Sequence, residues 1–174
     1  MSITPAQIQT LVETELTRID DPRVITHIRS LLVEPTVVLR EWNYGVPGQT
    51  YPCWSVLNHT QSNTGIAYCE FGFGPRAPWG LVSLSGASIN MSIGMDSGWY
   101  PSLLEAYFES WASVDLPIWR VFIYKLEDVP WPGTALTEES DWNSTWEELR
   151  RREGADPKSL YLHSHSIRIR PIET

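Results

Sequence analysis

The chain has no long apolar run and only two cysteines, and each shortage excludes a class of protein. Nowhere do 18 apolar residues follow one another, so the sequence predicts no membrane span. Two cysteines among 174 residues cannot form the framework of a small secreted disulfide protein. The first residues, MSITPAQIQTLVETELTRI, contain no basic segment of the kind that opens a signal peptide. We therefore expect a cytoplasmic protein whose two cysteines are reduced and buried.

The turn signal at residues 62–65 gives a second reason to expect free thiols. It centres a predicted hairpin near Asn63 and Thr64, which sets position 69 opposite position 58. Cys53 and Cys69 would then not face each other across the strands. A disulfide needs its two Cα atoms within about 7 Å, so this register disfavours a bond between them.

Basic residues are scarce in one long stretch of the chain. Residues 88–149 contain eleven acidic residues and two basic ones, Arg120 and Lys125, which accounts for more than the net charge of −8 on the whole chain. Binding to nucleic acid or to an anionic membrane needs clustered lysine and arginine, so we expect neither. Acidic residues of this kind keep a surface soluble, or they face a basic protein partner. Both interpretations stay open at this stage.

Aromatic residues and proline are abundant instead. The chain has nine tryptophans and thirteen prolines, with 42% hydrophobic residues, which is typical of a folded globular protein. Its length suits one domain over residues 1–174. A tryptophan-rich chain has an aromatic core or an aromatic binding surface, and we favour the core because large aromatic side chains are mostly buried.

Hydrophobic periodicity divides the chain into helices and strands. Thr4–Pro5 and Asp21–Pro22 each open a helix, and Thr137 is the predicted cap of a later one. The predicted fold is α+β: a largely antiparallel sheet with an N-terminal helix pair and two further helices packed on it. The predicted helices cover residues 5–18, 22–34, 101–112 and 137–153, and the predicted strands cover residues 36–44, 52–59, 65–73, 79–85, 119–126 and 160–169.

Two of these elements have predicted core faces. Alternation in residues 65–73 turns four side chains to the core, and the period of residues 101–112 gives an apolar helix face with Glu105 and Glu109 outside. The strand face consists of Ala67, Cys69, Phe71 and Phe73. The helix face consists of Leu103, Leu104, Tyr107, Phe108 and Trp111.

Gly72, Gly74 and Ala77 match the relaxed dinucleotide fingerprint G-x-G-x-x-A. A phosphate-binding loop of this kind opens a helix, whose first N–H groups face the pyrophosphate. Pro75 and Pro78 remove two such donors, and the sequence continues as a strand. We therefore interpret the segment as a turn, with Arg76 as an exposed charge at its tip, and expect no cofactor.

Histidine and serine raise two further hypotheses. His163 and His165 alternate on one strand face, but no cysteine pair or acidic cluster accompanies them, so buried histidines are favoured over a metal site. Ser97 in GMDSG stands one place too late for a G-x-S-x-G nucleophile. Glu105 and Glu109 could act as paired carboxylates of a glycosidase, but they lie on an outward helix face, where solvated acids are the rule. We assign no catalytic residue.

Residues 94–100, GMDSGWY, lie between a strand and a helix, where loops commonly carry binding residues. Together with AYCEFGFGPRAPWGLV, SIGMDSGWYPSLLEAYFESW and LPIWRVFIYK, this segment resembles small, acidic, tryptophan-rich bacterial proteins of the immunity type, which accompany polymorphic or contact-dependent toxins. The resemblance implies a stoichiometric inhibitor without cofactor or catalysis. The acidic stretch agrees with it, because it suits a basic toxin domain.

The sequence therefore predicts a non-enzymatic module that binds another protein through acids and an aromatic anchor. The expected binding residues are Asp96, Trp99, Glu105, Glu109, Asp141 and Glu147. Two alternatives stay open. One is a small hydrolase with a pocket near Ser97 and Trp99, and the other is a ligand sensor with an aromatic pocket.

Overall fold

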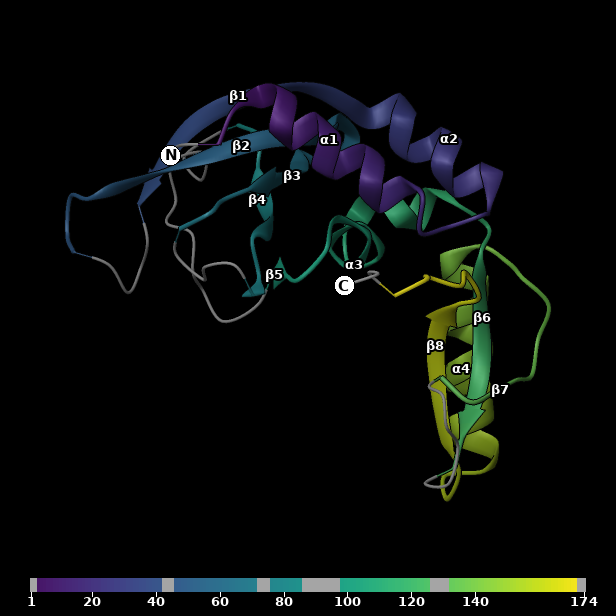
Figure 1. The fold of residues 1–174 in the computed structure, drawn as a ribbon. Helices are drawn as coiled ribbons and strands as arrows, with labels where there is room; N and C mark the ends of the chain where they lie inside the picture. The colour runs from purple at the N-terminus through teal and green to yellow at the C-terminus, as the bar shows by residue number, and fades with distance from the viewer. Residues whose placement is uncertain (1–2, 42–45, 72–75, 86–97, 126–131, 172–174) are drawn as a thin grey trace. The chain divides into compact units, whose positions relative to one another are not determined.

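The computed structural model of the chain describes residues 3–41, 46–71, 76–85, 98–125 and 132–171 (Figure 1). The chain divides into two compact units, which we describe separately. Unit 1 comprises Met1–Ser113 with Ile169–Thr174, and unit 2 comprises Val114–Arg168. The predicted α+β class is confirmed by four helices and two antiparallel sheets in the described residues. One domain over residues 1–174 stays a prediction, which cooperative unfolding of the two units would test.

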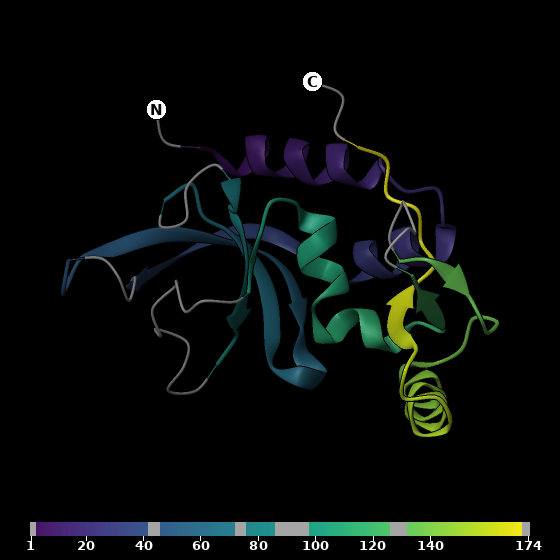
Figure 2. The same cartoon turned by 90° about the horizontal axis from the view of Figure 1, so that it is seen from below.

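Unit 1 contains a five-stranded antiparallel sheet in the order β1-β2-β3-β4-β5. Its strands bend strongly along their length, as the view from below shows (Figure 2). The five strands are β1 (Leu32–Glu41), β2 (Thr50–His59), β3 (Thr64–Tyr68), β4 (Trp79–Ser83) and β5 (Trp99–Tyr100).

Three helices pack on this sheet. α1 (Pro5–Leu16) and α2 (Pro22–Leu31) begin at the predicted caps: Thr4 accepts a hydrogen bond from the N–H of Gln7, and Asp21 accepts one from that of Arg23. α3 (Leu103–Phe108) is capped by Ser102. The N-terminal helices therefore cover the sheet as predicted, and α2 passes directly into β1, so that Pro35 lies in the strand rather than ending the helix.

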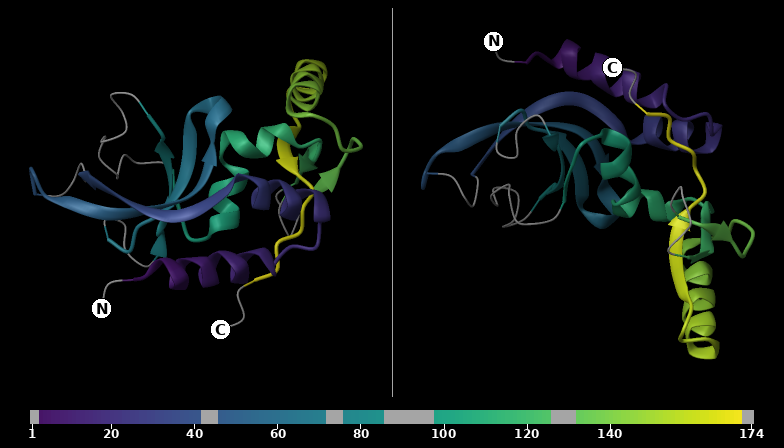
Figure 3. Two further views of the ribbon diagram at one scale, coloured as in Figure 1. Left: turned by 90° about the horizontal axis from the view of Figure 1, so that it is seen from above. Right: turned by 60° about the horizontal axis from the view of Figure 1, so that its bottom comes forward.

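The C-terminal residues of unit 1 return to α1 (Figure 3). The backbone N–H of Arg170 donates to the carbonyl of Arg18, at 2.8 Å between nitrogen and oxygen. The side chain of Arg170 also reaches Asp20, at 2.9 Å. Residues far apart in the sequence are thereby fixed at the end of α1.

The β2–β3 hairpin turns earlier than predicted. Thr60–Ser62 form a single 3-10 turn, and Asn63 adopts a left-handed conformation with φ of 57°, which asparagine tolerates better than most residues. A bulge between Ser55 and Leu57 shifts the register further, so that Trp54 lies opposite Tyr68. The predicted pairing of position 69 with position 58 is therefore wrong, and the same register continued by one residue sets Cys53 opposite Cys69.

Two predicted core residues of unit 1 lie at the surface. Phe71 follows the end of β3 and is 47% exposed, because β3 stops at Tyr68 and the alternation of sides ends with it. Trp111 was expected on the buried face of a helix that continues to residue 112, but α3 ends at Phe108. Trp111 instead opens a 3-10 helix (Trp111–Asp115) and is 62% exposed.

Unit 2 contains a three-stranded antiparallel sheet in the order β7-β6-β8, with α4 packed against β6 and β8. The strands are β6 (Trp119–Tyr124), β7 (Thr134–Ala135) and β8 (Leu160–His165). The helix α4 covers Trp142–Ala155 and is capped by Asp141, not by Thr137. Thr137 lies outside the helix because its hydroxyl accepts a hydrogen bond from the backbone N–H of Val121, at 3.0 Å.

The segment that matches the dinucleotide fingerprint leads into a strand. Gly72 and Gly74 lie outside the described residues, whereas Ala77 precedes β4, which begins at Trp79. Arg76 lies in a 3-10 turn, and no α-helix begins in the described residues 76–78, as a phosphate-binding loop would require.

Candidate functional site

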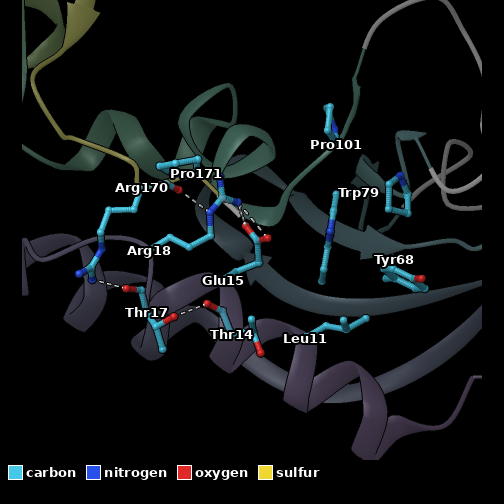
Figure 4. Close-up of a pocket in the computed structure, with 11 residues that line it drawn as sticks. Leu11, Thr14, Glu15, Thr17, Arg18, Tyr68, Trp79, Pro101, Arg170 and Pro171 are labelled. Atoms are coloured by element: carbon cyan, nitrogen blue, oxygen red, sulfur yellow. Dashed lines mark hydrogen bonds and ion pairs between the residues drawn. The ribbon is translucent and has the colours of Figure 1, made fainter. Parts of the chain in front are cut away.

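A groove of about 660 Å³ lies in unit 1 between α1 and the end of the sheet where β3 finishes and β4 begins (Figure 4). Leu11, Tyr68 and Trp79 form its apolar end, where the two rings meet edge to face at 5.1 Å between centroids. Pockets of this size commonly hold a small molecule or a side chain of a partner. The other residues that line it are Thr14, Glu15, Thr17, Arg18, Pro78, Pro101, Arg170 and Pro171.

An ion pair between Arg18 and Glu15 forms the polar end of the groove, so these two charges already have partners within the protein. Arg18 Nη1 lies 2.8 Å from Glu15 Oε2, and Arg18 Nε donates to the carbonyl of Arg170 at 2.8 Å. Burial raises the pKa of Glu15, and the positive charge of Arg18 opposes this shift. The charges at this end therefore hold α1 to the C-terminal segment, and the groove offers a ligand mainly its apolar end.

Trp111 and two predicted acids form a second candidate site in unit 1. Glu105 and Glu109 are exposed on α3, four residues apart, and Trp111 follows two residues later. We call Glu105, Glu109 and Trp111 the α3 surface. Both predicted acids are thus at the surface as expected, and the exposed aromatic residue beside them is Trp111.

Trp99, the predicted anchor, packs inside unit 1 instead. It lies on β5 opposite Gly80, and a Cβ atom on Gly80 would come within 2.4 Å of its indole ring. The ring also packs against the small buried cluster of Cys53, Ala67, Cys69 and Val82. Trp99 is partly buried, so much of its surface is committed to the sheet.

The remaining predicted binding residues lie in unit 2 or outside the described part of the chain. Asp96 and Ser97 fall outside the described residues. Asp141 and Glu147 are both exposed on α4, and the carboxylate of Asp141 accepts hydrogen bonds from the N–H and the hydroxyl of Ser144. These bonds lower the pKa of Asp141. Asp141 therefore has a structural role as a helix cap, which also fits the favourable position of an anion at a helix N-terminus.

A cluster of aromatic rings fills the space between α4 and its sheet in unit 2. Trp119 stacks on His163 at 5.1 Å between centroids, and Trp142 meets the same imidazole edge to face at 4.2 Å. Trp146 stacks on Trp142 on the outer side and is 38% exposed, with the guanidinium carbon of Arg150 lying 5.4 Å from its ring centroid. We call Trp119, Trp142, Trp146, His163 and His165 the tryptophan–histidine cluster.

The two histidines of this cluster are packing residues. His163 Nε2 lies 3.3 Å from the carbonyl oxygen of Trp142, and burial lowers the pKa of His163. Burial lowers that of His165 to about 4. Within the described ranges, no three His, Cys, Asp or Glu side chains gather where they could hold a metal ion.

Comparison with known proteins finds no relative for this chain. No protein-family model, no curated protein and no solved structure matches it. In the described part of the chain, no helix combines the length and the apolar character that a membrane crossing requires.

The sequence offered a signal for one of the residues that it misassigned. Ser110 and Ser113 flank Trp111 and are poor helix formers, and both hydroxyls bond back to carbonyls of the preceding turn. This pattern indicates the end of a helix before Trp111. The packing of Trp99 on Gly80 had no comparable signal, because it depends on the pairing of β4 with β5.

Proposed function

We propose that the chain is a non-enzymatic protein-binding module whose α3 surface docks a basic partner protein. The observation that carries this proposal is the exposure of Trp111: it is a large aromatic side chain that is 62% exposed, two residues after the exposed acid Glu109 and six after the exposed acid Glu105. Tryptophan is the residue type most enriched among binding hot spots, and an acidic rim favours a basic partner.

The backbone around Trp111 is fixed, so its side chain is presented rather than loosely placed. Ser110, Ala112 and Ser113 are all buried. The hydroxyl of Ser110 donates to the carbonyl of Tyr107 at 2.7 Å, and that of Ser113 donates to the carbonyl of Ser110 at 2.9 Å. A rigid anchor loses little conformational entropy when a partner covers it, which favours binding.

The helix under this surface is also rigid. Leu103, Leu104 and Tyr107 are fully buried, and the hydroxyl of Tyr107 lies 2.7 Å from Nδ1 of His27 on α2. Side chains on such a helix are held at fixed positions. The α3 surface therefore has the support that a preorganised binding site needs.

The two acids of the α3 surface differ in what they cost the isolated chain. Glu105 lies in the first turn of α3, where an anion is favourable, and its carboxylate accepts a hydrogen bond from the hydroxyl of Ser102 at 3.1 Å. Like charges four residues apart on a helix destabilise it by about 0.2–0.5 kcal/mol, and Glu109 lies at the C-terminal end, where an anion opposes the helix dipole. The ion pairs of the described residues include neither Glu105 nor Glu109. A cationic partner would relieve the repulsion between the two acids and the unfavourable position of Glu109, so Glu109 suits binding better than stability.

The partner class that we propose follows from the charge of the chain and from its resemblance to immunity proteins. A net charge of −8 attracts a basic domain over long range and speeds its association. A basic toxin domain that the chain neutralises stoichiometrically fits both features. Asp96, Asp141 and Glu147 stay predicted binding residues.

Affinity capture from the native cells with matched variants tests the proposal. Leu39 on β1 is 59% exposed, so Leu39→Ser is a control for the loss of an exposed apolar side chain of unit 1. We expect the wild-type chain and Leu39→Ser to capture the same basic protein. Trp111→Ser should bind it roughly 30-fold more weakly once the partner is purified, as the loss of a tryptophan hot spot predicts.

A second pair of measurements separates the acids from the aromatic anchor. Glu105→Lys with Glu109→Lys should slow association and reduce its dependence on salt, whereas Trp111→Ser should mainly speed dissociation. Equal affinity of Trp111→Ser and the wild-type chain for the captured protein, or the capture of no basic protein, would contradict the proposal.

The groove of unit 1 favours a second candidate function, the sensing of a small apolar or aromatic ligand. The meeting of Leu11, Tyr68 and Trp79 in a groove of about 660 Å³ is the observation behind it. A thermal-shift screen of small aromatic compounds tests it, with Leu11→Asp as the variant that should lose any stabilisation. A small hydrolase near Ser97 stays an alternative, which turnover of ester, phosphate or glycoside substrates sensitive to Ser97→Ala would support.

A further inference from the structure

The two cysteines of the chain lie side by side in the five-stranded sheet. Trp54 of β2 pairs with Tyr68, the last residue of β3, so the same antiparallel register continued by one residue sets Cys53 opposite Cys69. Both thiols are fully buried and both are free in the structure. The thiol of Cys53 donates to the backbone carbonyl of Tyr51, at 3.7 Å, and the two cysteines lie close enough to shift each other's pKa.

Cys53 and Cys69 occupy non-hydrogen-bonded positions, at which the Cα atoms of antiparallel strands approach most closely. The backbone N–H of Cys69 donates to the carbonyl of Pro78, at 2.8 Å, so the ladder bonds of Cys69 point away from β2. Cys53 and Cys69 therefore form a non-hydrogen-bonded pair, in which the Cα atoms of an antiparallel sheet are about 4.5 Å apart. This separation lies within the range that a disulfide spans, about 4.4–6.8 Å.

The surroundings leave room for a bond between the two sulfurs. Ala67 and Val82 complete the buried cluster around them, and Tyr51 and Trp99 pack against it. Ala67 is a small neighbour, and the buried guanidinium of Arg40 lies near enough to act on the pKa of Cys53. Closing the bond buries no new charge and displaces no large side chain from between the sulfurs.

We propose that Cys53 and Cys69 are a redox-active pair that closes to an intramolecular cross-strand disulfide when the protein meets a low-molecular-weight disulfide. The consequence is a covalent tie between β2 and β3 beneath Trp99. This tie constrains the unfolded chain and stabilises unit 1.

Cys69 is the residue that reacts first. It follows the last residue of β3, and its neighbours Glu70 and Phe71 are exposed, so local opening of this strand end exposes it at low cost. Cys53 lies within the longer strand β2, as its fourth residue. The neighbouring thiol of Cys53 lowers the pKa of Cys69, whereas the neighbouring thiol of Cys69 and burial raise the pKa of Cys53.

The chemistry balances with oxidised glutathione as the oxidant. The Cys69 thiolate attacks one sulfur of glutathione disulfide, which forms a mixed disulfide and releases one glutathione thiolate. The Cys53 thiolate then attacks the Cys69 sulfur, forms the intramolecular bond and releases the second glutathione. Two electrons pass from the cysteines to the glutathione disulfide, and the two thiol protons end on the two glutathione molecules.

The first test treats the folded protein with excess oxidised glutathione and measures its intact mass. We expect the wild-type chain to lose the mass of two hydrogen atoms, to stay monomeric and to bind no alkylating reagent after unfolding. Cys53→Ser should instead gain one glutathione on Cys69. Persistence of two alkylatable thiols, addition of two glutathiones or a disulfide-linked dimer would each overturn the proposal.

The second test shows whether the native fold favours the bond. The equilibrium constant for disulfide formation against a glutathione buffer is measured in native buffer and in concentrated urea. We expect this equilibrium constant to be about 10- to 100-fold larger in native buffer than in urea. By thermodynamic linkage, this ratio equals the factor by which the disulfide increases the folding equilibrium constant. An equal or smaller constant in native buffer would show that the sheet holds the sulfurs apart. Circular dichroism shows whether Cys53→Ser is folded.

Discussion

Unit 1 and unit 2 bury different kinds of side chain. The largest fully buried residues of unit 1 are mostly aliphatic and come from three helices and the sheet, as with Ile8, Ile28, Ile66 and Leu104. Unit 2 has few such residues, and its helix meets its sheet through the tryptophan–histidine cluster. A small unit has much surface for its volume, so it cannot surround many aliphatic side chains completely.

This difference shows how the abundant tryptophans divide their roles. A large ring stabilises a small unit even when one edge stays in water, because each aromatic side chain buries a large area and stacks on its neighbours. In unit 2, Trp119 is buried while Trp146 is half exposed on the same stack. In unit 1, aliphatic side chains supply most of the core, and Trp111 lies at the surface.

The largest expected effect comes from removing the centre of the unit 2 cluster. Trp119 is 3% exposed and contacts Trp142, His163 and His165. Trp119→Ala should lower the free energy of unfolding of unit 2 by about 3–5 kcal/mol, the usual cost of deleting a large buried aromatic side chain. Hydrogen exchange measured by mass spectrometry, segment by segment, reports this loss.

The same experiment decides whether the two units form one cooperative domain, as predicted from chain length. If they do, Trp119→Ala destabilises the slowest-exchanging amides of unit 1 by the same amount. If they do not, unit 1 keeps its protection. Trp111→Ala is the matched control and should change stability by less than about 0.5 kcal/mol, because its side chain is exposed. A loss under about 1 kcal/mol for Trp119→Ala would show that the cluster contributes little packing.

The second effect is a change of stability with pH, to which His165 in unit 2 and Glu15 in unit 1 contribute with opposite signs. Burial lowers the pKa of His165 from 6.5 to about 4, so the unfolded chain binds the proton more readily than the folded one. Unit 2 should therefore lose up to about 3 kcal/mol as the pH falls from 6.5 towards 4. In unit 1, burial raises the pKa of Glu15, so the folded state takes up this proton first and the Glu15 contribution becomes more favourable in acid.

Amide hydrogen exchange over this pH range, corrected for the intrinsic exchange rate, shows whether the stability of each unit rises or falls with pH. His165→Gln should flatten the profile of unit 2, and Glu15→Gln should remove the Glu15 contribution from that of unit 1. A unit 2 that is equally stable at pH 4 and pH 6.5 would mean that its histidines stay accessible to protons.

The smallest effects compare one glycine from each unit. Alanine at Gly80 would place its Cβ 2.4 Å from the ring of Trp99, so Gly80→Ala should destabilise unit 1 by about 1–3 kcal/mol. Alanine at Gly154 in α4 meets nothing within 4 Å, so Gly154→Ala should stabilise unit 2 by about 0.5–1 kcal/mol. Urea unfolding measures both changes. A neutral Gly80→Ala would mean that Trp99 can move off the sheet without cost.

Local signals in the sequence determined two of the four helix starts in the described residues. Thr4 and Asp21 cap helices as predicted, since the hydrogen bonds that they make lie within three residues. Thr137 failed as a predicted cap because a strand bond to Val121 competes for its hydroxyl, and Asp141 took its place. Such competition between partners distant in the chain leaves no trace in local sequence.

The candidate site was predicted only in part for a similar reason. Glu105 and Glu109 followed from helical period alone, and both are exposed. The exposure of Trp111 depended on where α3 stops, and the burial of Trp99 depended on a strand pair with Gly80. Aromatic character by itself does not tell an anchor from a core residue.

The sequence by itself determined the α+β class, the helix starts at Thr4 and Asp21, and the acidic character of the chain. These properties rest on composition and on contacts within one helical turn or one strand. Only the tertiary structure decided which tryptophans are exposed and that Cys53 lies beside Cys69. Both outcomes depend on register, where one bulge and an earlier turn change every partner across the strands.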